Sequence, residues 1–239
     1  MAQNDNIENE DVNVETVEQI PRRRSTDSIN GFMQDNRRML VYGGGGLLAI
    51  VALIFGYKYF ISDPMELEAE AKVHQAEAYY GMDSVNLALK GDGMHSGLKE
   101  VADDYPGTKA GKRAAYYLGM NLLNTGKFDE AIEYLENYDL GDKIVQPLAI
   151  GAIGDCYSEK NELEKAASYY LKAAESSKLD FPAPRFYKKA GVVYEQLKDY
   201  DKALSVYETI QKEHPKSQEA YEMDKYIARA KTMLGKEEE

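Results

Sequence analysis

The chain has 239 residues and a formal net charge of −12, and this acidic balance argues against a nucleic-acid-binding domain, which usually has a basic face. Its composition, 44% hydrophobic and 29% charged, is that of a folded protein of one or two domains. One cysteine excludes an intrachain disulfide and an all-cysteine zinc site, and three histidines far apart in sequence exclude an HExxH-type metal motif.

Residues 1–38 are polar and contain eight acidic residues and five arginines, a net charge of −3. Apolar residues are few in this segment and show no sustained period. Such a segment cannot bury enough apolar surface to offset the entropy of ordering it. We therefore predict a mostly disordered tail.

The nineteen residues from Met39 to Tyr57 contain no charged side chain. As a helix they would be about 28 Å long, close to the thickness of the hydrocarbon core of a bilayer. Three further apolar residues, 59–61, extend the run past Lys58, whose amine can reach the interface. The run is too long for a buried core helix or a signal-peptide core, and no small-residue cleavage site follows at once. We therefore predict an uncleaved transmembrane helix over residues 39–61.

The charges beside this span predict its orientation, because lysine and arginine accumulate on the cytoplasmic side. Lys58 and then several acidic residues follow the span, and the residues beyond 61 carry a net charge of −10. We predict a single-pass protein of the bacterial inner membrane, with a cytoplasmic N-terminus and a periplasmic C-terminal domain. The arginines on the N-terminal side are Arg22, Arg23, Arg24, Arg37 and Arg38.

Small residues lie along one face of the predicted span. Gly45, Ala49, Ala52 and Gly56 are spaced by four, three and four residues. A face of this kind lets a second transmembrane helix approach closely, although small residues are also common in membrane helices generally. We treat these four residues as a candidate membrane helix-packing face.

The region beyond the span contains a repeat in which a small residue precedes an alanine by twelve positions, three times, with periods of 35 and 37 residues. The spacing resembles the tetratricopeptide repeat, a helix–turn–helix unit of about 34 residues. Gly126, Asn161 and Lys198 occupy the predicted turns, and apolar residues recur at helical spacing. The repeat-defining residues are Gly119, Ala131, Gly154, Ala166, Gly191, Ala203 and Pro215.

The expected fold is therefore all-α, with one N-terminal transmembrane helix followed by a tetratricopeptide-repeat α-solenoid. In the first repeat we expect one long helix over residues 66–90 and Gly97 as the small crossing residue. The last helix should run from Ser217 to Leu234. The predicted segments are 1–38 as the cytoplasmic tail, 39–61 as the transmembrane helix, 62–111 as a divergent first repeat, 112–216 as three repeats, and 217–239 as a capping helix and tail.

In the tetratricopeptide family the first helix of each repeat lines a concave surface. The resemblance implies a groove that mixes charge, tyrosine and methionine and that suits an extended peptide or protein segment. Alternatively the surface stays exposed to solvent or packs on a neighbour. Met120, Asp155 and Val192 stand where some family members use asparagine to clamp a C-terminal carboxylate. The residues at lining positions are Arg113, Tyr116, Met120, Asn124, Leu148, Gly151, Asp155, Glu159, Arg185, Lys188, Val192 and Glu195.

Catalytic chemistry has little support in the sequence. Cys156 has no partner cysteine and is expected to be a small buried residue. None of His74, His95 and His214 has a neighbouring nucleophile in sequence. We therefore predict a protein that is not an enzyme and has no metal and no cofactor.

The arrangement also resembles a narrower family, the YfgM-type ancillary subunit of the bacterial SecYEG translocon. The resemblance rests on Phe32 and Asn36 ahead of a glycine-rich span, on the acidic repeat domain, and on the segment 161–167. It implies a non-catalytic periplasmic adaptor that associates with the SecYEG translocon, a PpiD-like membrane chaperone and translocating client proteins, with lipid around the anchor and no nucleic acid. The alternative is a scaffold in another envelope complex, for cell division, envelope-spanning transport or cytochrome c maturation.

Overall fold

The computed structural model describes residues 31–82 and 84–235, so the predicted tail over residues 1–30 lies outside the described residues. No strand occurs in these ranges, and the all-α prediction is confirmed. The chain forms two compact units, residues 1–56 and residues 57–239. Their described elements are α2 (Arg37–Tyr57), η1 (Lys58–Ser62), α3 (Asp63–Gly81), α4 (Val85–Lys90), α5 (Leu98–Asp104), α6 (Lys109–Asn124), α7 (Phe128–Glu136), α8 (Val145–Glu159), α9 (Leu163–Glu175), α10 (Ala183–Gln196), α11 (Tyr200–Glu213), η2 (Glu219–Glu222) and α12 (Met223–Met233).

Helix α2 contains residues 39–57 of the predicted span, the remaining residues 58–61 lie in η1, and neither element has a buried residue. Helix α2 begins two residues before Met39, and a π-helical turn, η1, follows Tyr57. By length and composition this helix could cross a membrane. A Cβ atom added at Gly45 or Gly56 would have no neighbour within 4 Å, so the small-residue face is open.

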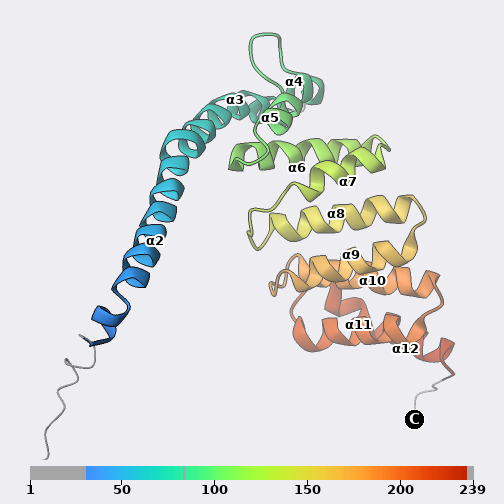
Figure 1. The fold of residues 1–239 in the computed structure, drawn as a ribbon. Helices are drawn as coiled ribbons and strands as arrows, with labels where there is room; N and C mark the ends of the chain where they lie inside the picture. Colours follow the sequence, from blue (N-terminus) through green and yellow to red (C-terminus); the bar gives the residue numbers. More distant parts are fainter. Residues whose placement is uncertain (1–30, 83, 236–239) are drawn as a thin grey trace, which may run out of the picture. The chain divides into compact units, whose positions relative to one another are not determined.

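The second unit is a stack of helices in which sequence neighbours pack together, with α6 to α12 layered in chain order (Figure 1). Each of the three clear repeats is a helical pair: α6 with α7, α8 with α9, and α10 with α11. The apolar side chains between these helices form the core. This is how a solenoid buries surface that a single helical pair would leave exposed.

The helices of each pair cross where the first helix has a glycine. A Cβ at Gly119 would lie 2.6 Å from Leu135, and one at Gly154 would lie 2.7 Å from the ring of Tyr170. At Gly191 the distance to the ring of Tyr207 would be 2.2 Å. The alanines of the second helices, Ala131, Ala166 and Ala203, have no exposed surface. Only a residue without a side chain fits where the facing side chain crosses the helix backbone.

The turn inside each clear repeat contains one residue in the left-handed region. The backbone angle φ is +78° at Gly126, +58° at Asn161 and +60° at Lys198. These residues occupy equivalent places in the three repeats. The turn has the same left-handed residue in each repeat, although only the first repeat has glycine there. Asparagine tolerates this conformation better than most residues, whereas lysine adopts it at a cost.

The first repeat differs from the prediction in two respects. The expected helix over residues 66–90 is wrong, because α3 ends at Gly81 and α4 begins at Val85. Gly97 is not a helix-crossing residue: it precedes α5, and a Cβ there would meet backbone atoms of Leu89 at 2.4 Å. Glycine is needed at that point because two backbone segments meet within one loop, which helical spacing alone does not reveal.

The predicted C-terminal helix is also interrupted. The hydroxyl oxygen of Ser217 accepts a hydrogen bond from the backbone N–H of Ala220, which lies in the short turn η2 (Glu219–Glu222), so Ser217 does not cap α12. Helix α12 ends at Met233, and Gly235 follows with φ of +69°. Its side chains Met223, Ile227 and Ala230 are buried, so α12 closes this end of the core.

Candidate interaction groove

Two adjoining cavities run along the first helices of the second and third clear repeats. One has a volume of about 530 Å³ and the other about 630 Å³. They share Ser158, Tyr170 and Lys189, so together they form one continuous surface, which we call the groove. Among the predicted lining positions, the groove includes Asn124, Asp155, Glu159, Arg185, Lys188 and Val192.

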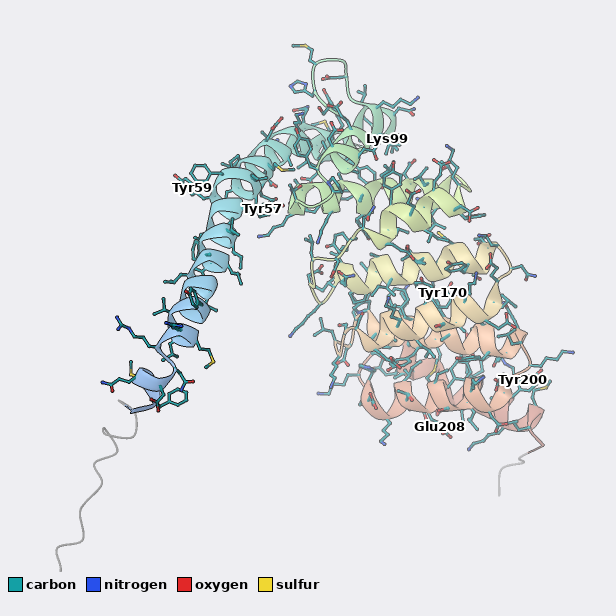
Figure 2. All side chains as sticks on the ribbon, in the orientation of Figure 1. Tyr57, Tyr59, Lys99, Tyr170, Tyr200 and Glu208 are labelled. Atoms are coloured by element: carbon teal, nitrogen blue, oxygen red, sulfur yellow. The ribbon has the colours of Figure 1, made fainter. Side chains whose placement is uncertain are left out.

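Asp155 lies at the junction of the two cavities and is held from two sides. The Tyr170 hydroxyl and the Lys189 amine each donate to its Oδ1 atom, both at 2.5 Å. Tyr170 comes from α9 and reaches the groove by passing over Gly154; its position among the stacked helices is labelled in Figure 2. Burial, and then the hydrogen bond to Asp155, raise the pKa of Tyr170 well above its usual value. The hydroxyl therefore stays a neutral donor that orients the carboxylate.

A second pair lies at the far end of the larger cavity. The Lys188 amine donates to a carboxylate oxygen of Glu222 at 2.7 Å. Burial acts to lower the pKa of Lys188, but the hydrogen bond to Glu222 and the interactions with Glu222 and Tyr226 together raise the pKa above its usual value. Lys188 is therefore fully charged and already paired.

Arg185 differs from these lysines. Its side chain is exposed, and the structure gives it no ion pair within residues 31–82 and 84–235. At the other end of the groove, Glu159 is exposed and has no partner in the described part of the chain. The groove thus has an unpaired cation lining the larger cavity, an unpaired carboxylate lining the smaller one, and apolar surface from Phe181 and Val192 in the larger cavity. Such a surface can bind an extended polypeptide segment that has apolar side chains and charge.

Several predicted lining residues lie elsewhere. Arg113 is paired with two carboxylates of α3, at 3.0 Å from Glu70 and 2.9 Å from Glu77. Tyr116 and Met120 pack against the core, the former with its ring 5.3 Å from that of Tyr138. Arg113 thus joins α6 to α3, and none of these three residues lines either cavity of the groove.

Three further positions are also used for packing. Leu148 packs against the core of the second and third repeats. Gly151 gives room to Phe186, whose ring would lie 1.9 Å from an added Cβ. Glu195 is paired with Arg229 of α12 at 2.6 Å.

Sequence reasoning missed Tyr170 and Lys189, which hold the centre of the groove. A signal for Lys189 was present, because opposite charges recur one repeat apart: Asp155 with Lys189, and Glu195 with Arg229, each 34 residues apart. Tyr170 gave no such signal, since it belongs to a second helix and enters the groove only because Gly154 has no side chain.

The cysteine and two of the histidines considered as catalytic candidates are buried or hydrogen-bonded to an acidic residue. Cys156 is fully buried, and burial raises the pKa of its thiol to about 11. His95 contacts Asp92 at 2.9 Å and His214 contacts Asp180 at 3.1 Å. Within the described residues no group of three or more histidine, cysteine or acidic side chains could hold a metal ion.

Comparison with known proteins identifies the repeat. Models of the tetratricopeptide repeat match residues 113–138, 149–178 and 189–217, which are the three clear repeats. The chain therefore carries tetratricopeptide repeats, whose general role is that of a scaffold for protein–protein interaction.

A curated relative, the chloroplastic protein FLUORESCENT IN BLUE LIGHT of Arabidopsis thaliana, is 36% identical over 77 residues, which cover 30% of this chain. The match spans about a quarter (24%) of that protein. A solved structure of a Podosopora anserina protein assigned as a kinesin light chain, with nearly identical TPR-like repeats, is 14% identical, with a TM-score of 0.50 over 70% of this chain and 87% of that one. MamA AMB-1 is 20% identical, with a TM-score of 0.46 over 72% of this chain and 90% of that one.

Proposed function

We propose that this protein is a membrane-anchored adaptor of the bacterial inner membrane, whose repeat domain works in the periplasm beside the SecYEG translocon. There it recruits a PpiD-like membrane chaperone or holds segments of proteins that emerge from the translocon. The function needs no catalytic group. It uses the repeat domain for protein contacts and the apolar helix for location.

The observation that carries the proposal is the groove. Its central carboxylate, Asp155, is oriented by Tyr170 and Lys189, while Arg185 and Glu159 stay unpaired in the described chain. Oriented charges beside apolar surface suit recognition of a polypeptide. Helix α2, apolar and without a buried residue, supports the anchoring. The arginines ahead of the apolar run and the acidic residues after it support a periplasmic location for the repeats.

A photo-crosslinker placed at Ala49 tests the anchor. Cells that express the full chain should give adducts with a translocon subunit or with the chaperone's membrane helix, identified by mass spectrometry. A crosslinker at Ile54, on the opposite side of the helix from the predicted small-residue face, is the matched control and should give fewer of these adducts. Recovery of lipid adducts alone from Ala49, or of subunits of a division or cytochrome c maturation complex, would contradict the proposal.

Charge reversal tests the groove. Arg185→Glu should reduce co-purification of the chaperone or of a translocating client by at least tenfold, which corresponds to about 1.4 kcal/mol. Lys212→Glu is the matched control, because Lys212 is exposed on α11 and does not line the groove. If the two variants retain equal amounts of partner, the groove is not the recognition surface.

A further inference from the structure

A separate cavity lies between the divergent first repeat and the first clear repeat, within the unit formed by residues 57–239. Its volume is about 330 Å³, and its lining includes the apolar side chains of Leu89, Leu118 and Leu122. Ligand pockets range from about 300 to 1,000 Å³, so this cavity is of a size that suits one side chain better than a large cofactor. We call it the leucine cavity.

The two other clear repeats have a tyrosine at the position of Leu122. The repeat periods of 35 and 37 residues place Leu122 in register with Tyr157 in the second clear repeat and with Tyr194 in the third. The amine of Lys165 lies over the ring of Tyr157, 5.0 Å from its centre. Lys202, the counterpart of Lys165, lies over the ring of Tyr194 at 5.4 Å. An aromatic ring is therefore the usual occupant of this place in the repeat.

The surroundings of the Tyr157 ring correspond to the lining of the leucine cavity. The side chains that stack on this ring or lie over it are Lys160, Lys165 and Tyr169. Their counterparts 35 residues earlier all line the leucine cavity and are Thr125, Glu130 and Tyr134. The leucine cavity is thus the space that a tyrosine ring fills in the second clear repeat and that the shorter Leu122 leaves open.

The aromatic wall of the leucine cavity is held in place by hydrogen bonds. The Tyr134 hydroxyl donates to Asp103 at 2.7 Å and accepts from the Lys99 amine at 3.0 Å. Lys99, which is labelled in Figure 2, also lies over the Tyr134 ring, 5.6 Å from its centre. A wall that is already ordered loses little conformational entropy when a second ring stacks on it, and this favours binding.

The lysines at the rim of the leucine cavity differ in their pairing. Lys99 is paired with Asp103 at 2.5 Å, and Lys127 with Glu130 at 3.3 Å, so neither of them selects the charge of a ligand. Lys90, the last residue of α4, is exposed and has no ion pair in the described part of the chain. A carboxylate beside a bound ring would therefore meet an uncompensated positive charge at Lys90.

We propose that the leucine cavity binds a tyrosine or phenylalanine side chain of a partner protein that has an aspartate or glutamate next to it. The ring stacks on Tyr134 and packs against Leu122, as the ring of Tyr157 stacks within the second clear repeat. The neighbouring carboxylate pairs with Lys90. The leucine cavity shares no lining residue with the groove, so this contact is additional to the one proposed there.

Three synthetic peptides of equal length test the ligand chemistry. The first has a tyrosine between two aspartates, the second has alanine in place of the tyrosine, and the third has lysines in place of the aspartates. Their binding to the full chain in nanodiscs of zwitterionic lipid is measured by isothermal titration calorimetry. The alanine peptide should bind at least tenfold more weakly than the first peptide, because it loses the buried ring. The lysine peptide should bind about threefold more weakly, as expected for an exposed ion pair.

Leu122→Tyr tests the position of binding, because it supplies the ring that the other two clear repeats already have. The variant should fold, since tyrosine occupies both equivalent positions, and it should weaken binding of the first peptide by at least tenfold. Leu122→Met is the matched control: it conserves the side-chain volume and should keep the parent affinity. Thermal melts of both variants show whether the repeat domain stays folded.

Lys90→Glu tests the charge at the rim. It should weaken binding of the first peptide by about threefold and strengthen binding of the lysine peptide. Lys212→Glu is the matched control, because Lys212 is exposed on α11 and does not line the leucine cavity, and it should change neither affinity. Both residues are exposed, so both variants should fold.

The proposal is overturned if the first peptide does not bind, if it binds no better than the alanine peptide, or if Leu122→Tyr binds it as well as Leu122→Met does. Equal affinities of Lys90→Glu and Lys212→Glu would also contradict it. Self-association of the parent chain that is lost in Leu122→Tyr would assign the cavity to a second copy instead, and binding of a fatty acid that is lost in this variant would assign it to a lipid chain. None of these outcomes affects the test of the groove at Arg185, which does not line the leucine cavity.

Discussion

The first helical pair and the third clear repeat hold their helices together by different means. In the third repeat, α10 and α11 meet where Gly191 lies beneath the ring of Tyr207. In the first, a hydrogen bond joins α3 to the loop after α4: Asp92 accepts from the Tyr79 hydroxyl at 2.7 Å, and within the loop it also accepts from the N–H of His95 at 2.7 Å. The regular repeats have a glycine at each helix crossing, whereas the divergent repeat has no such helix-crossing glycine in α3 and adds polar contacts to its buried apolar side chains.

This difference determines which substitutions each region tolerates. A buried crossing cannot admit another carbon without moving two helices, because protein interiors are packed as densely as organic crystals. A polar contact near the surface tolerates added volume, but it is lost when its donor or acceptor is removed. The two regions should therefore respond to opposite kinds of mutation, which the following experiments test.

The largest effect is expected at the helix crossing. Gly191→Val should destabilise the repeat domain by about 3 kcal/mol, the upper end of ordinary overpacking, because an added Cβ would lie 2.2 Å from a buried tyrosine ring. Gly81→Ala in α3 is the control: nothing lies within 4 Å of its Cβ position, so stability should stay unchanged or rise by about 0.5–1 kcal/mol. Urea unfolding of the two variants measures both. A similar loss in each would remove the distinction between the regions.

A smaller loss is expected when the polar contacts of the first repeat are cut. Arg113→Met keeps the apolar stem of the side chain but removes the charged hydrogen bonds to Glu70 and Glu77. It should cost about 1–2 kcal/mol, between the values for exposed ion pairs and for buried charged hydrogen bonds. Hydrogen exchange should rise in α3 and remain unchanged in α10. Equal exchange in both helices would contradict a local role.

The turns of the regular repeats offer a stabilising change. Lys198 has φ of +60°, a conformation that costs a residue with a Cβ roughly 1–2 kcal/mol. Lys198→Gly should raise stability by about 0.5–1 kcal/mol after the extra entropy of glycine in the unfolded chain is subtracted. Gly126→Ala, at the equivalent turn with φ of +78°, should lower stability by a similar amount. Thermal melts of both variants would show whether the three turns are equivalent.

The smallest expected effect depends on pH. Burial acts to raise the pKa of Asp142, but hydrogen bonds from the Tyr138 hydroxyl and from the N–H groups of Val145 and Ile144 outweigh it and lower the pKa. A depressed folded-state pKa means that this contribution is present above the unfolded value of about 4 and is lost as pH falls through the folded value. Asp142→Asn should therefore unfold with less dependence on pH below about 4. The measurement is the free energy of unfolding of both chains between pH 2 and pH 7. If the parent chain and Asp142→Asn lose stability in parallel as pH falls, the prediction is wrong.

The repeat architecture could be predicted because its signals are local. Gly119, Gly154 and Gly191 each precede an alanine by twelve residues, since a helical pair needs one close approach at a fixed distance along the chain. The matches to models of the repeat fall on the same segments. The break between α3 and α4 was missed because the apolar spacing of residues 66–90 continues on both sides of it, and Gly97 was misassigned because its close contact is with its own loop.

The sequence by itself determined the helical class, the three repeats and the apolar segment, because each depends on spacing within one helix or one helical pair. Only the tertiary structure decided which side chains share a surface. Arg113 occupies a lining position of its repeat, yet two carboxylates of α3 draw it into a packing contact. Tyr170 lies on a second helix, yet it reaches Asp155 over Gly154. The physical reason is that contacts between repeats depend on the shape of neighbouring side chains, which no period along the chain encodes.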